Sequence, residues 1–444
     1  MPDPLALHYT VRVVDSALQI VEVDLTVRDN HASSVQLAFS SNAIQTDAPV
    51  SRFRIRSATG SSGQPLEILR ENGIWRIDGS DEMQIHYEVH LSEGQNKGVY
   101  ASELLSSCDP GGARFLGSDL FLFPLHAEAG SLDVDYELPP SWELVHPFQT
   151  APTSASYPDL RSLYFSVVAA GEYRTLSRTI GGSELVLAAR GDFRFGDPDL
   201  METIARIAQE EIEFFGGSMR PRYVFVVNPH PRGDDRQRLH YFGLHFVASM
   251  AILLDPRTDR LSLQAEPAQI IAHEFFHNWN GELIRQEDYE MNWFIEGVTT
   301  FYSYKFCQDA RMLDGGSLVR ELNERYDNHY VSNPKRGEIT LAEAGKTVLQ
   351  NQDTTQLLYS GGMLAALALD IEIGNRTDHQ KTLNDIMLDL ASRATRDAEW
   401  HLTREELRWS LADATGTEFE PWLQSYIYGL EPLELPDYIR DVSR

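Results

Sequence analysis

The sequence predicts an α+β protein with a β-rich amino-terminal part and an α-helical carboxy-terminal part. In the first third, apolar and polar residues alternate with a period of two, which is the pattern of strands with one buried face. The pattern changes after about residue 190, and from about residue 310 onward apolar residues recur at helical spacing. Because 444 residues exceed one ordinary core, we expect two or three packed units.

The strand pattern is clearest at residues 21–28, where Val21, Val23 and Leu25 alternate with polar or charged residues. Residues 35–39 repeat the pattern, and clusters of Gly, Ser and Asn separate such segments. Several short strands of this kind predict a β-sandwich-like amino-terminal domain over residues 1–175.

Helix and strand signals alternate in the middle of the chain. Asp197, followed by proline, supplies a capping side chain and a first-turn residue, and Gly216 is expected to end that helix. Residues 223–227 predict an apolar strand, and residues 243–254 predict another. We therefore expect a second domain over residues 176–310.

The last part of the chain, residues 311–444, is expected to form an α-helical carboxy-terminal domain. Apolar residues recur at helical spacing in three runs, at 361–373, 382–394 and 403–414.

A short motif carries most of the chemical information. Residues 273–277 read HEFFH, and Glu296 follows the second histidine after 18 intervening residues. On a helix, side chains four apart share one face, so His273 and His277 can bind the same ion. Glu274 lies about 100° around that helix, close enough to act as a base on a water at the ion. With Glu296 as the third ligand, one tetrahedral position stays open, which is the arrangement of a catalytic zinc site.

The alternative is an accidental motif on a helix of core and solvated histidines. Residues 292–306 predict a second helix rich in aromatic and branched residues, and a carboxylate there is costly to bury unless it is paired or bound to a metal. Glu296 is therefore the expected ligand. The polar segment between the two helices predicts a solvated loop, although it holds four more acidic residues, Glu282, Glu287, Asp288 and Glu290.

Composition narrows the partners. A net charge of −28 argues against a nucleic-acid partner, because binding phosphates needs a basic face. Cys108 and Cys307 are far apart and do not form a metal-binding spacing, and so few cysteines fit a reducing compartment. The sequence starts without a secretory signal, and no stretch approaches 18 uninterrupted apolar residues. We therefore expect a cytoplasmic location and no membrane span, while the oligomeric state stays open.

Together these residues resemble the gluzincin zinc metallopeptidases, and in particular the glycyl aminopeptidase family, which is related to the neutral aminopeptidases. The resemblance implies Zn²⁺ as the cofactor, a peptide or protein as the substrate, and a thermolysin-like fold for the catalytic domain at residues 176–310. It covers nearly the whole chain and rests on four segments: HEFFHNWN at 273–280, WFIEGVT at 293–299, LYSGGMLAALALD at 358–370 and SYIYGLEPL at 425–433.

The resemblance also assigns a role to Tyr359. In these peptidases, a tyrosine at the matching position donates a hydrogen bond to the oxyanion of the tetrahedral intermediate. Charge that develops on the carbonyl oxygen needs a placed donor in addition to the metal. Without the resemblance, Tyr359 would be one of 18 tyrosines, and a core or surface role would be the default.

Residues 242–246 depart from the pattern of the glycyl aminopeptidases. That family usually has the segment GGLEH there, and its glutamate is placed to bind the free amino group of a substrate. The counterpart here is FGLHF, so His245 takes the position of the glutamate. Gly243, Leu244 and His245 are the expected substrate-binding residues, although a lone histidine in an apolar strand is usually an interior or edge residue. The 18-residue spacing before Glu296 matches the neutral aminopeptidases.

The sequence thus predicts an aminopeptidase-like zinc metallopeptidase that hydrolyses peptide bonds with a metal-activated water. Glu274 is the expected base and Tyr359 the expected oxyanion donor. One alternative is an endopeptidase, because a histidine cannot anchor an ammonium group as a carboxylate does. Another is a peptide-binding protein that keeps the fold without turnover. Some relatives of this fold open an epoxide, but no residue here indicates that chemistry.

Overall fold

The structure, a computed structural model, divides the chain into two compact units. It describes residues 4–39, 52–79, 81–92, 106–126, 128–231, 238–347 and 351–435. Unit 1 comprises residues 1–178, 184–192 and 222–256, and unit 2 comprises residues 179–183, 193–221 and 257–444. The division into domains at 1–175, 176–310 and 311–444 stays a prediction.

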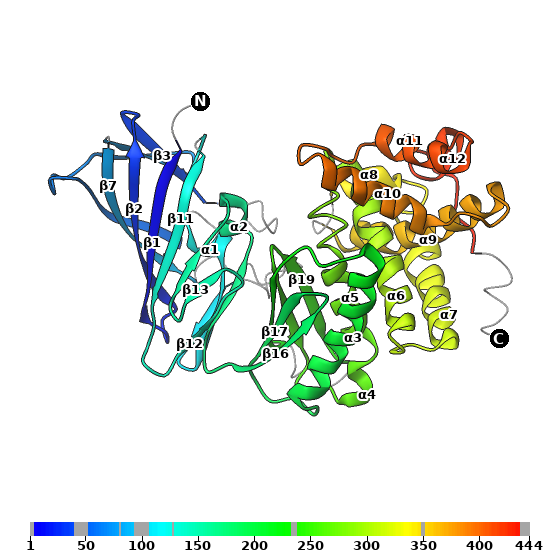
Figure 1. The fold of residues 1–444 in the computed structure, drawn as a ribbon, viewed down its shortest axis with the longest axis horizontal. Helices are drawn as coiled ribbons and strands as arrows, with labels where there is room; N and C mark the ends of the chain where they lie inside the picture. Colours follow the sequence, from blue (N-terminus) through cyan, green and yellow to red (C-terminus); the bar gives the residue numbers. More distant parts are fainter. Residues whose placement is uncertain are drawn as a thin grey trace. The chain divides into compact units, whose positions relative to one another are not determined.

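Unit 1 begins with a seven-stranded sheet in the order β13-β14-β11-β1-β2-β7-β4 (Figure 1). The predicted alternation appears in β2, where every second side chain from Val21 to Val27 is fully buried. The strands of this sheet are β1 (Leu5–Asp15), β2 (Ile20–Asn30), β4 (Phe53–Gly60), β7 (Asp81–His90), β11 (Ala129–Glu137), β13 (Gln149–Ala151) and β14 (Ser154–Ser156).

Two four-stranded sheets share a hydrophobic core with the large sheet. Trp75 of one small sheet, for example, lies 6.3 Å from Phe53 of the large sheet, measured between ring centroids. One small sheet has the order β10-β3-β6-β5: β10 (Phe123–Pro124), β3 (Ser34–Ala38), β6 (Ile74–Asp78) and β5 (Ile68–Glu71). The other has the order β12-β15-β9-β8: β12 (Glu143–Val145), β15 (Val167–Gly171), β9 (Gly112–Leu116) and β8 (Ser107–Asp109). Two short helices, α1 (Gly117–Leu120) and α2 (Leu160–Tyr164), complete this part.

A five-stranded sheet follows in the order β16-β17-β18-β20-β19, with β17, β18 and β20 parallel and β19 antiparallel to β20 at the edge. The single strand expected over residues 243–254 is wrong. It is a hairpin of β19 and β20, because the chain turns at Ala248, whose φ of 54° is left-handed. The strands are β16 (Arg174–Ile180), β17 (Ser183–Ala189), β18 (Arg222–Pro229), β19 (Tyr241–Phe246) and β20 (Ser249–Leu254).

Apart from the strand residues at 179–183, unit 2 is helical over its described residues outside loops and isolated bridges. Its first helix is α3 (Asp197–Phe215), which has proline in its first turn and ends at Gly216 with a φ of 76°, as the sequence predicts. The others are α4 (Arg260–Leu263), α5 (Glu266–Phe276), α6 (Thr299–Asp309), α7 (Gly315–Glu324), α8 (Leu341–Gly345), α9 (Gln352–Arg376), α10 (Leu383–Arg396), α11 (Arg404–Thr415) and α12 (Glu420–Tyr426). Three shorter or wider turns, η3 (Tyr289–Met291), η4 (Trp293–Val298) and η5 (Arg325–Val331), lie between them.

Aromatic packing holds the helices of unit 2 together. Phe276 at the end of α5 stacks on Tyr302 of α6, with 5.0 Å between ring centroids and 15° between the rings. Phe215 at the end of α3 stacks on Trp279 just after α5, at 4.6 Å and 9°. Offset stacking of this kind adds to the free energy of apolar burial, so these pairs fix where α3, α5 and α6 meet.

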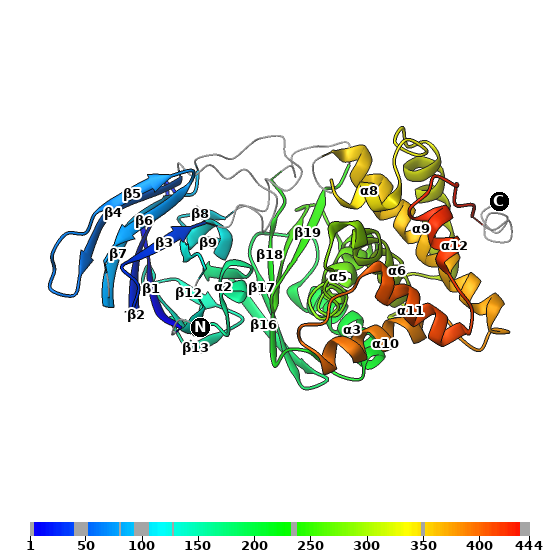
Figure 2. The ribbon, with the colours of Figure 1, turned by 90° about the horizontal axis from the view of Figure 1, so that it is seen from above.

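Helix α9 runs through the helical part of unit 2 and contacts η4, η5, α6, α8 and α10 (Figure 1, Figure 2). By length and composition it is apolar enough to cross a membrane, yet 67% of its most apolar window is buried inside the protein. That burial is the property of a core helix, which has apolar side chains all round. The α+β class with β-rich and helical parts is therefore confirmed, and the thermolysin-like detail stays a prediction.

Candidate metal centre

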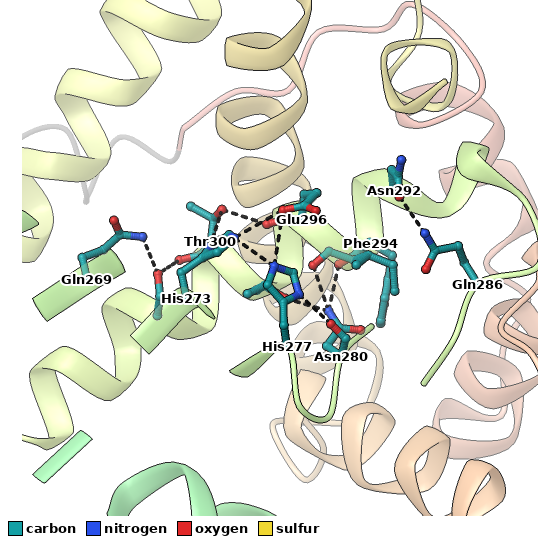
Figure 3. A network of polar contacts seen from close by, with 12 residues as sticks. Gln269, His273, His277, Asn280, Gln286, Asn292, Phe294, Glu296 and Thr300 are labelled. Carbon is teal, nitrogen blue, oxygen red and sulfur yellow. Dashed lines mark hydrogen bonds and ion pairs between the residues drawn. The ribbon is translucent and has the colours of Figure 1, made fainter. Parts of the chain in front are cut away.

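Three side chains of unit 2 converge on one point. Nε2 of His273 lies 3.1 Å from Nε2 of His277, and these atoms lie 3.3 Å and 3.5 Å from Oε2 of Glu296 (Figure 3). Of the residues that the structure describes, this is the only group of three or more His, Cys, Asp or Glu side chains with the geometry to bind a metal. The three residues are those that the sequence predicts as ligands.

The triangle has the size that a zinc ion requires. Donor atoms about 2.0–2.1 Å from a tetrahedral zinc ion stand about 3.3–3.4 Å from one another. The three observed separations, 3.1, 3.3 and 3.5 Å, lie around that value. Three donors leave the fourth corner of a tetrahedron open, so the set fits a catalytic rather than a closed structural site.

Helix α5 supplies the two histidines. Proline stands in its first turn, where the missing N–H costs nothing, and His277 is its last, half-helical residue. His273 and His277 are four residues apart and therefore project from the same face. Their exposed fractions are 5% and 8%, so both rings are largely removed from water.

Glu296 lies on η4, a π-helical turn that leads directly into α6. The predicted helix over residues 292–306 is thus two elements, and the site lies in the irregular one. A π turn widens the helix and redirects its side chains, and such turns are frequent at functional sites. The side chain of Glu296 is 19% exposed.

Hydrogen bonds fix which nitrogen of each imidazole faces the centre. Nδ1 of His277 lies 2.8 Å from the carbonyl oxygen of Asn280, so it carries the proton and donates. Thr300 donates its hydroxyl to the carbonyl of Glu296 at 2.8 Å and accepts from Nδ1 of His273 at 3.4 Å. Nε2 is therefore the nitrogen of each ring that faces the centre, and it offers its lone pair to a metal ion once it has given up its own proton, as metal-binding histidines with such partners do.

Within the triangle, burial and the neighbouring charges shift the pKa values of His277 and Glu296 in opposite directions. Burial alone would lower the pKa of His277, but the charge of Glu296 and a hydrogen bond to it raise that pKa to about 9. Burial alone would raise the pKa of Glu296, but contacts with His277 and His273 hold it well below its usual range. Glu296 is therefore an anion at neutral pH, and its charge requires a cation beside it.

Two further residues that the sequence singles out lie at this centre. Glu274 follows His273 on α5 and is 9% exposed. The ring of Tyr359, on α9, stacks on the ring of His273 with 5.6 Å between centroids and 26° between the planes. The structure thus brings the predicted base and the predicted oxyanion donor together with the predicted ligands.

A glycine contact determines how closely α9 approaches η4. A methyl group added at Gly297 would lie 2.4 Å from Cα of Gly362, and one added at Gly362 would lie 2.8 Å from Cα of Gly297. Gly297 follows Glu296, and Gly362 lies one turn beyond Tyr359 on the same helix. The two glycines therefore allow the backbones that carry the ligand and the tyrosine to touch.

The predicted substrate-binding residues Gly243, Leu244 and His245 lie in unit 1, on the edge strand β19. His245 is 7% exposed, and its Nδ1 lies 3.1 Å from the hydroxyl of Tyr223. That hydroxyl donates to the carbonyl of Ser249 at 2.9 Å, so His245 is the donor toward it. Their contact with a substrate stays a prediction.

The structure corrects one expectation about the loop after α5. Glu282 is not solvated: it is 2% exposed and forms an ion pair with Arg220. The sequence pattern assigns no role to Asn280 or Thr300, both of which are buried and hydrogen-bonded to ligand residues. Asn280 is the last residue of the HEFFHNWN segment. A polar residue that follows several aromatic residues so closely is the one sequence feature that indicates a buried polar contact there.

Part of the chain, including the metal centre, matches a known family model. Residues 237–386, which include all three ligand residues and Tyr359, match the model of the Peptidase family M1 domain. Aminopeptidase N of Haemophilus influenzae is 27% identical over 129 residues. That alignment covers 27% of this chain and 14% of the Haemophilus enzyme, so the chain matches only a small part of that relative.

Solved structures share the fold over nearly the whole chain. An aminopeptidase N family protein from Idiomarina loihiensis has a TM-score of 0.81 at 16% identity, covering 98% of this chain and 78% of that one. An M1 zinc metallopeptidase variant from Deinococcus radiodurans, bound to the substrate Tyr-Ser-Ala, has a TM-score of 0.57 at 15% identity, covering 97% and 94%. The fold is therefore that of M1 aminopeptidases, and the expected resemblance to this group of zinc peptidases is confirmed for the matched segment and for the fold.

Proposed function

We propose that this protein is a zinc-dependent metallopeptidase that hydrolyses peptide bonds in the manner of an aminopeptidase. The observation that carries the proposal is the triangle of His273, His277 and Glu296, whose donor atoms are spaced as a tetrahedral zinc ion requires. The M1 family model and the zinc peptidases of the same fold support it.

The residues around the triangle supply the other parts of the reaction. Zinc, when bound, polarises the scissile carbonyl and lowers the pKa of water toward about 7. Glu274, next to a ligand on the same helix, accepts the proton of the attacking water and transfers it to the leaving amine. Tyr359, stacked on His273, donates a hydrogen bond to the oxyanion as charge develops there.

We propose that the substrate peptide binds along strand β19. Among the strands that the structure describes, β19 pairs with β20 and lies at the end of its sheet, and a strand in that place is where an extended peptide binds through main-chain hydrogen bonds. Gly243, Leu244 and His245 are the proposed substrate-binding residues. A histidine is neutral or cationic, so His245 does not offer the negative charge that would anchor a free amino group.

That observation favours a second candidate function, an endopeptidase of the same chemistry. The two are separated by digesting a mixed peptide library with free or acetylated amino termini and identifying the products by mass spectrometry. An aminopeptidase removes single residues from free termini only, whereas an endopeptidase cleaves both libraries internally. A zinc-loaded protein that cleaves neither library would support a peptide-binding protein instead.

The role of Glu274 is tested by Glu274→Gln, which keeps the shape of the side chain and removes the base. We expect kcat to fall by about 10²–10⁴-fold, the usual contribution of general acid–base catalysis, with zinc content unchanged. The fall is measured with a peptide that the wild-type protein cleaves. Undiminished hydrolysis by the zinc-loaded variant would remove Glu274 from the mechanism.

A further inference from the structure

We propose that Asn280 is a positioning residue of the metal centre, because it joins the π-helical turn that carries Glu296 to the end of the helix that carries His277. This inference rests on the proposed zinc site. It concerns how the ligands are held in place and adds no ligand to the set.

The side chain of Asn280 contacts η4 at several points. Its Nδ2 lies 3.2 Å from the carbonyl oxygen of Phe294 and 3.1 Å from that of Ile295. The same nitrogen lies 3.0 Å from the hydroxyl oxygen of Thr299, where η4 passes into α6 (Figure 3). All three acceptors lie within three residues of Glu296, so this one amide contacts the turn on both sides of the ligand.

The main chain of Asn280 contacts the other ligand. Its carbonyl oxygen accepts the hydrogen bond from Nδ1 of His277 at 2.8 Å, which fixes the orientation of that ring. One residue therefore holds the imidazole of His277 through its backbone and the turn of Glu296 through its side chain. The distance of 3.5 Å between those two ligands depends on this residue.

The contact is needed because the turn is buried and irregular. Asn280 is fully buried, as are Phe294 and Thr299. A π turn departs from the regular α-helical pairing of N–H and C=O groups, and a buried carbonyl left without a partner costs about 1–3 kcal/mol. An amide that donates to two successive carbonyls stabilises the π turn relative to a regular α turn, which would redirect Glu296.

Asn278 provides a matched control two residues earlier. It is also buried, at 3% exposure, and its Nδ2 also donates to a backbone carbonyl, that of Phe275 at 2.7 Å. That carbonyl belongs to α5 itself, so the bond of Asn278 is local and joins no second element. Truncating either asparagine removes a buried amide of the same kind from the same loop.

The test compares Asn280→Ala with Asn278→Ala in the full chain. Zinc affinity of the metal-free proteins is measured by competition with a chromophoric chelator, and the visible spectrum of the cobalt-loaded proteins reports the ligand geometry. We expect Asn280→Ala to weaken zinc binding by about 10–100-fold, as loss of an outer-shell partner does, and to change the cobalt spectrum. Asn278→Ala is expected to match the wild-type protein in both.

The proposal is overturned if Asn280→Ala binds zinc as tightly as the wild type, or if both variants weaken it equally. If Asn280→Ala does not fold, Thr299→Val decides, because it removes one acceptor of Asn280 and keeps the shape. We expect it to weaken zinc binding by about 3–10-fold, the contribution of one hydrogen bond. Unchanged zinc affinity of Thr299→Val would then refute the proposal.

The proposed function and this inference can fail separately. A wild-type protein that binds zinc but cleaves no peptide would refute the proposed function and leave this inference unaffected.

Discussion

Glu296 and Glu211, two glutamates of unit 2 that are withdrawn from water, have their carboxyl groups held in opposite ways. Glu296 lies on η4 against two imidazoles, which hold its pKa well below its usual range. Glu211 lies on α3, fully buried, and neither of its carboxyl oxygens has a hydrogen-bond partner among the described residues. Burial raises the pKa of Glu211 well above its usual range.

The difference shows that burial sets the cost of a charge, while the neighbours decide whether the charge is kept. Glu296, the less buried of the two, is an anion, because cationic partners stabilise it more than burial penalises it. Glu211 has no such partner among the described residues, so burial disfavours its ionised form and raises its pKa. The nearby thiol of Cys307 has its pKa raised by burial first and by Glu211 second, so it is an inert core residue. One region thus stabilises a negative charge, and the other penalises it.

The largest effect that separates the two regions is expected from Glu296→Gln, which removes the charge and keeps the shape. Because Glu296 is one of three ligands, we expect zinc affinity to fall well beyond the ~10–100-fold cost of losing an outer-shell partner. Elemental analysis after dialysis, together with chelator competition, measures the change. Glu211→Gln is the control and should bind zinc as the wild type does. If Glu296→Gln retained tightly bound zinc, the charge of Glu296 would not be needed for zinc binding, and the two glutamates would not differ in that respect.

A second effect is expected from Tyr359→Phe, which keeps the ring stacked on His273 and removes the hydroxyl. Loss of one oxyanion donor typically lowers kcat by about 10²–10³-fold. We expect that loss in peptide hydrolysis, with zinc affinity and KM nearly unchanged, because the ring contact remains. An unchanged kcat would place the oxyanion donor elsewhere in the protein.

A smaller effect is expected from Gly362→Ala, which separates α9 from η4. The added methyl group would lie 2.8 Å from Cα of Gly297 and 2.9 Å from the carbonyl oxygen of Trp293, both backbone atoms that cannot turn aside. A displacement of about 1 Å at a catalytic group can cost up to about 10²-fold in rate, so we expect kcat to fall by about 10–100-fold. Steady-state kinetics of the zinc-loaded variant measure the loss.

Gly361→Ala is the control for this substitution. It makes the same change one residue earlier, but its methyl group meets Cδ2 of Leu341 at 2.7 Å, the end of a flexible side chain. We expect near wild-type kinetics from it. In a Tyr359→Phe background, Gly362→Ala should cost little more, because the two changes act on the same group. Full additivity of the two losses would contradict a role for the glycine contact in placing the tyrosine.

Helix geometry explains which parts of the site the sequence predicts. His273 and His277 are four apart on an amphipathic helix, so their common face follows from local geometry alone. Glu296 follows from its place in an apolar segment, where a charge requires a partner. The carboxy-terminal end of α3 follows from Gly216, whose local preference agrees with the tertiary structure. The predicted capping by Asp197 is wrong, because Gly196 is the N-cap residue and the carboxylate of Asp199 accepts from its N–H.

The rest depends on contacts that are distant in sequence. The π turn at η4 has no local signature, because it is stabilised by the amide of Asn280 from another element. Glu282 is buried because Arg220, far away in the chain, pairs with it. Glu211 is predictable in part. Its helical spacing from Ile204 and Ile207 places it on the apolar face of α3, but the spacing does not show that its carboxyl group lacks a hydrogen-bond partner among the described residues.

The smallest effect is expected from Glu211→Gln, and it depends on pH. The pKa of Glu211 is higher in the folded than in the unfolded protein, so the folded state holds the proton more tightly. Its contribution to stability is complete below the unfolded pKa of about 4.3 and is lost as the pH rises through the folded pKa, at up to about 1.4 kcal/mol per pH unit. We expect Glu211→Gln to match the wild type near pH 4–5 and to be the more stable of the two proteins at pH 8, as measured by urea unfolding at each pH. Glu213→Gln, at an exposed position of the same helix, should stay within about 0.5 kcal/mol of the wild type throughout. A difference between Glu211→Gln and the wild type that does not grow with pH would show that Glu211 is ionised in the folded protein, and the contrast with Glu296 would be lost.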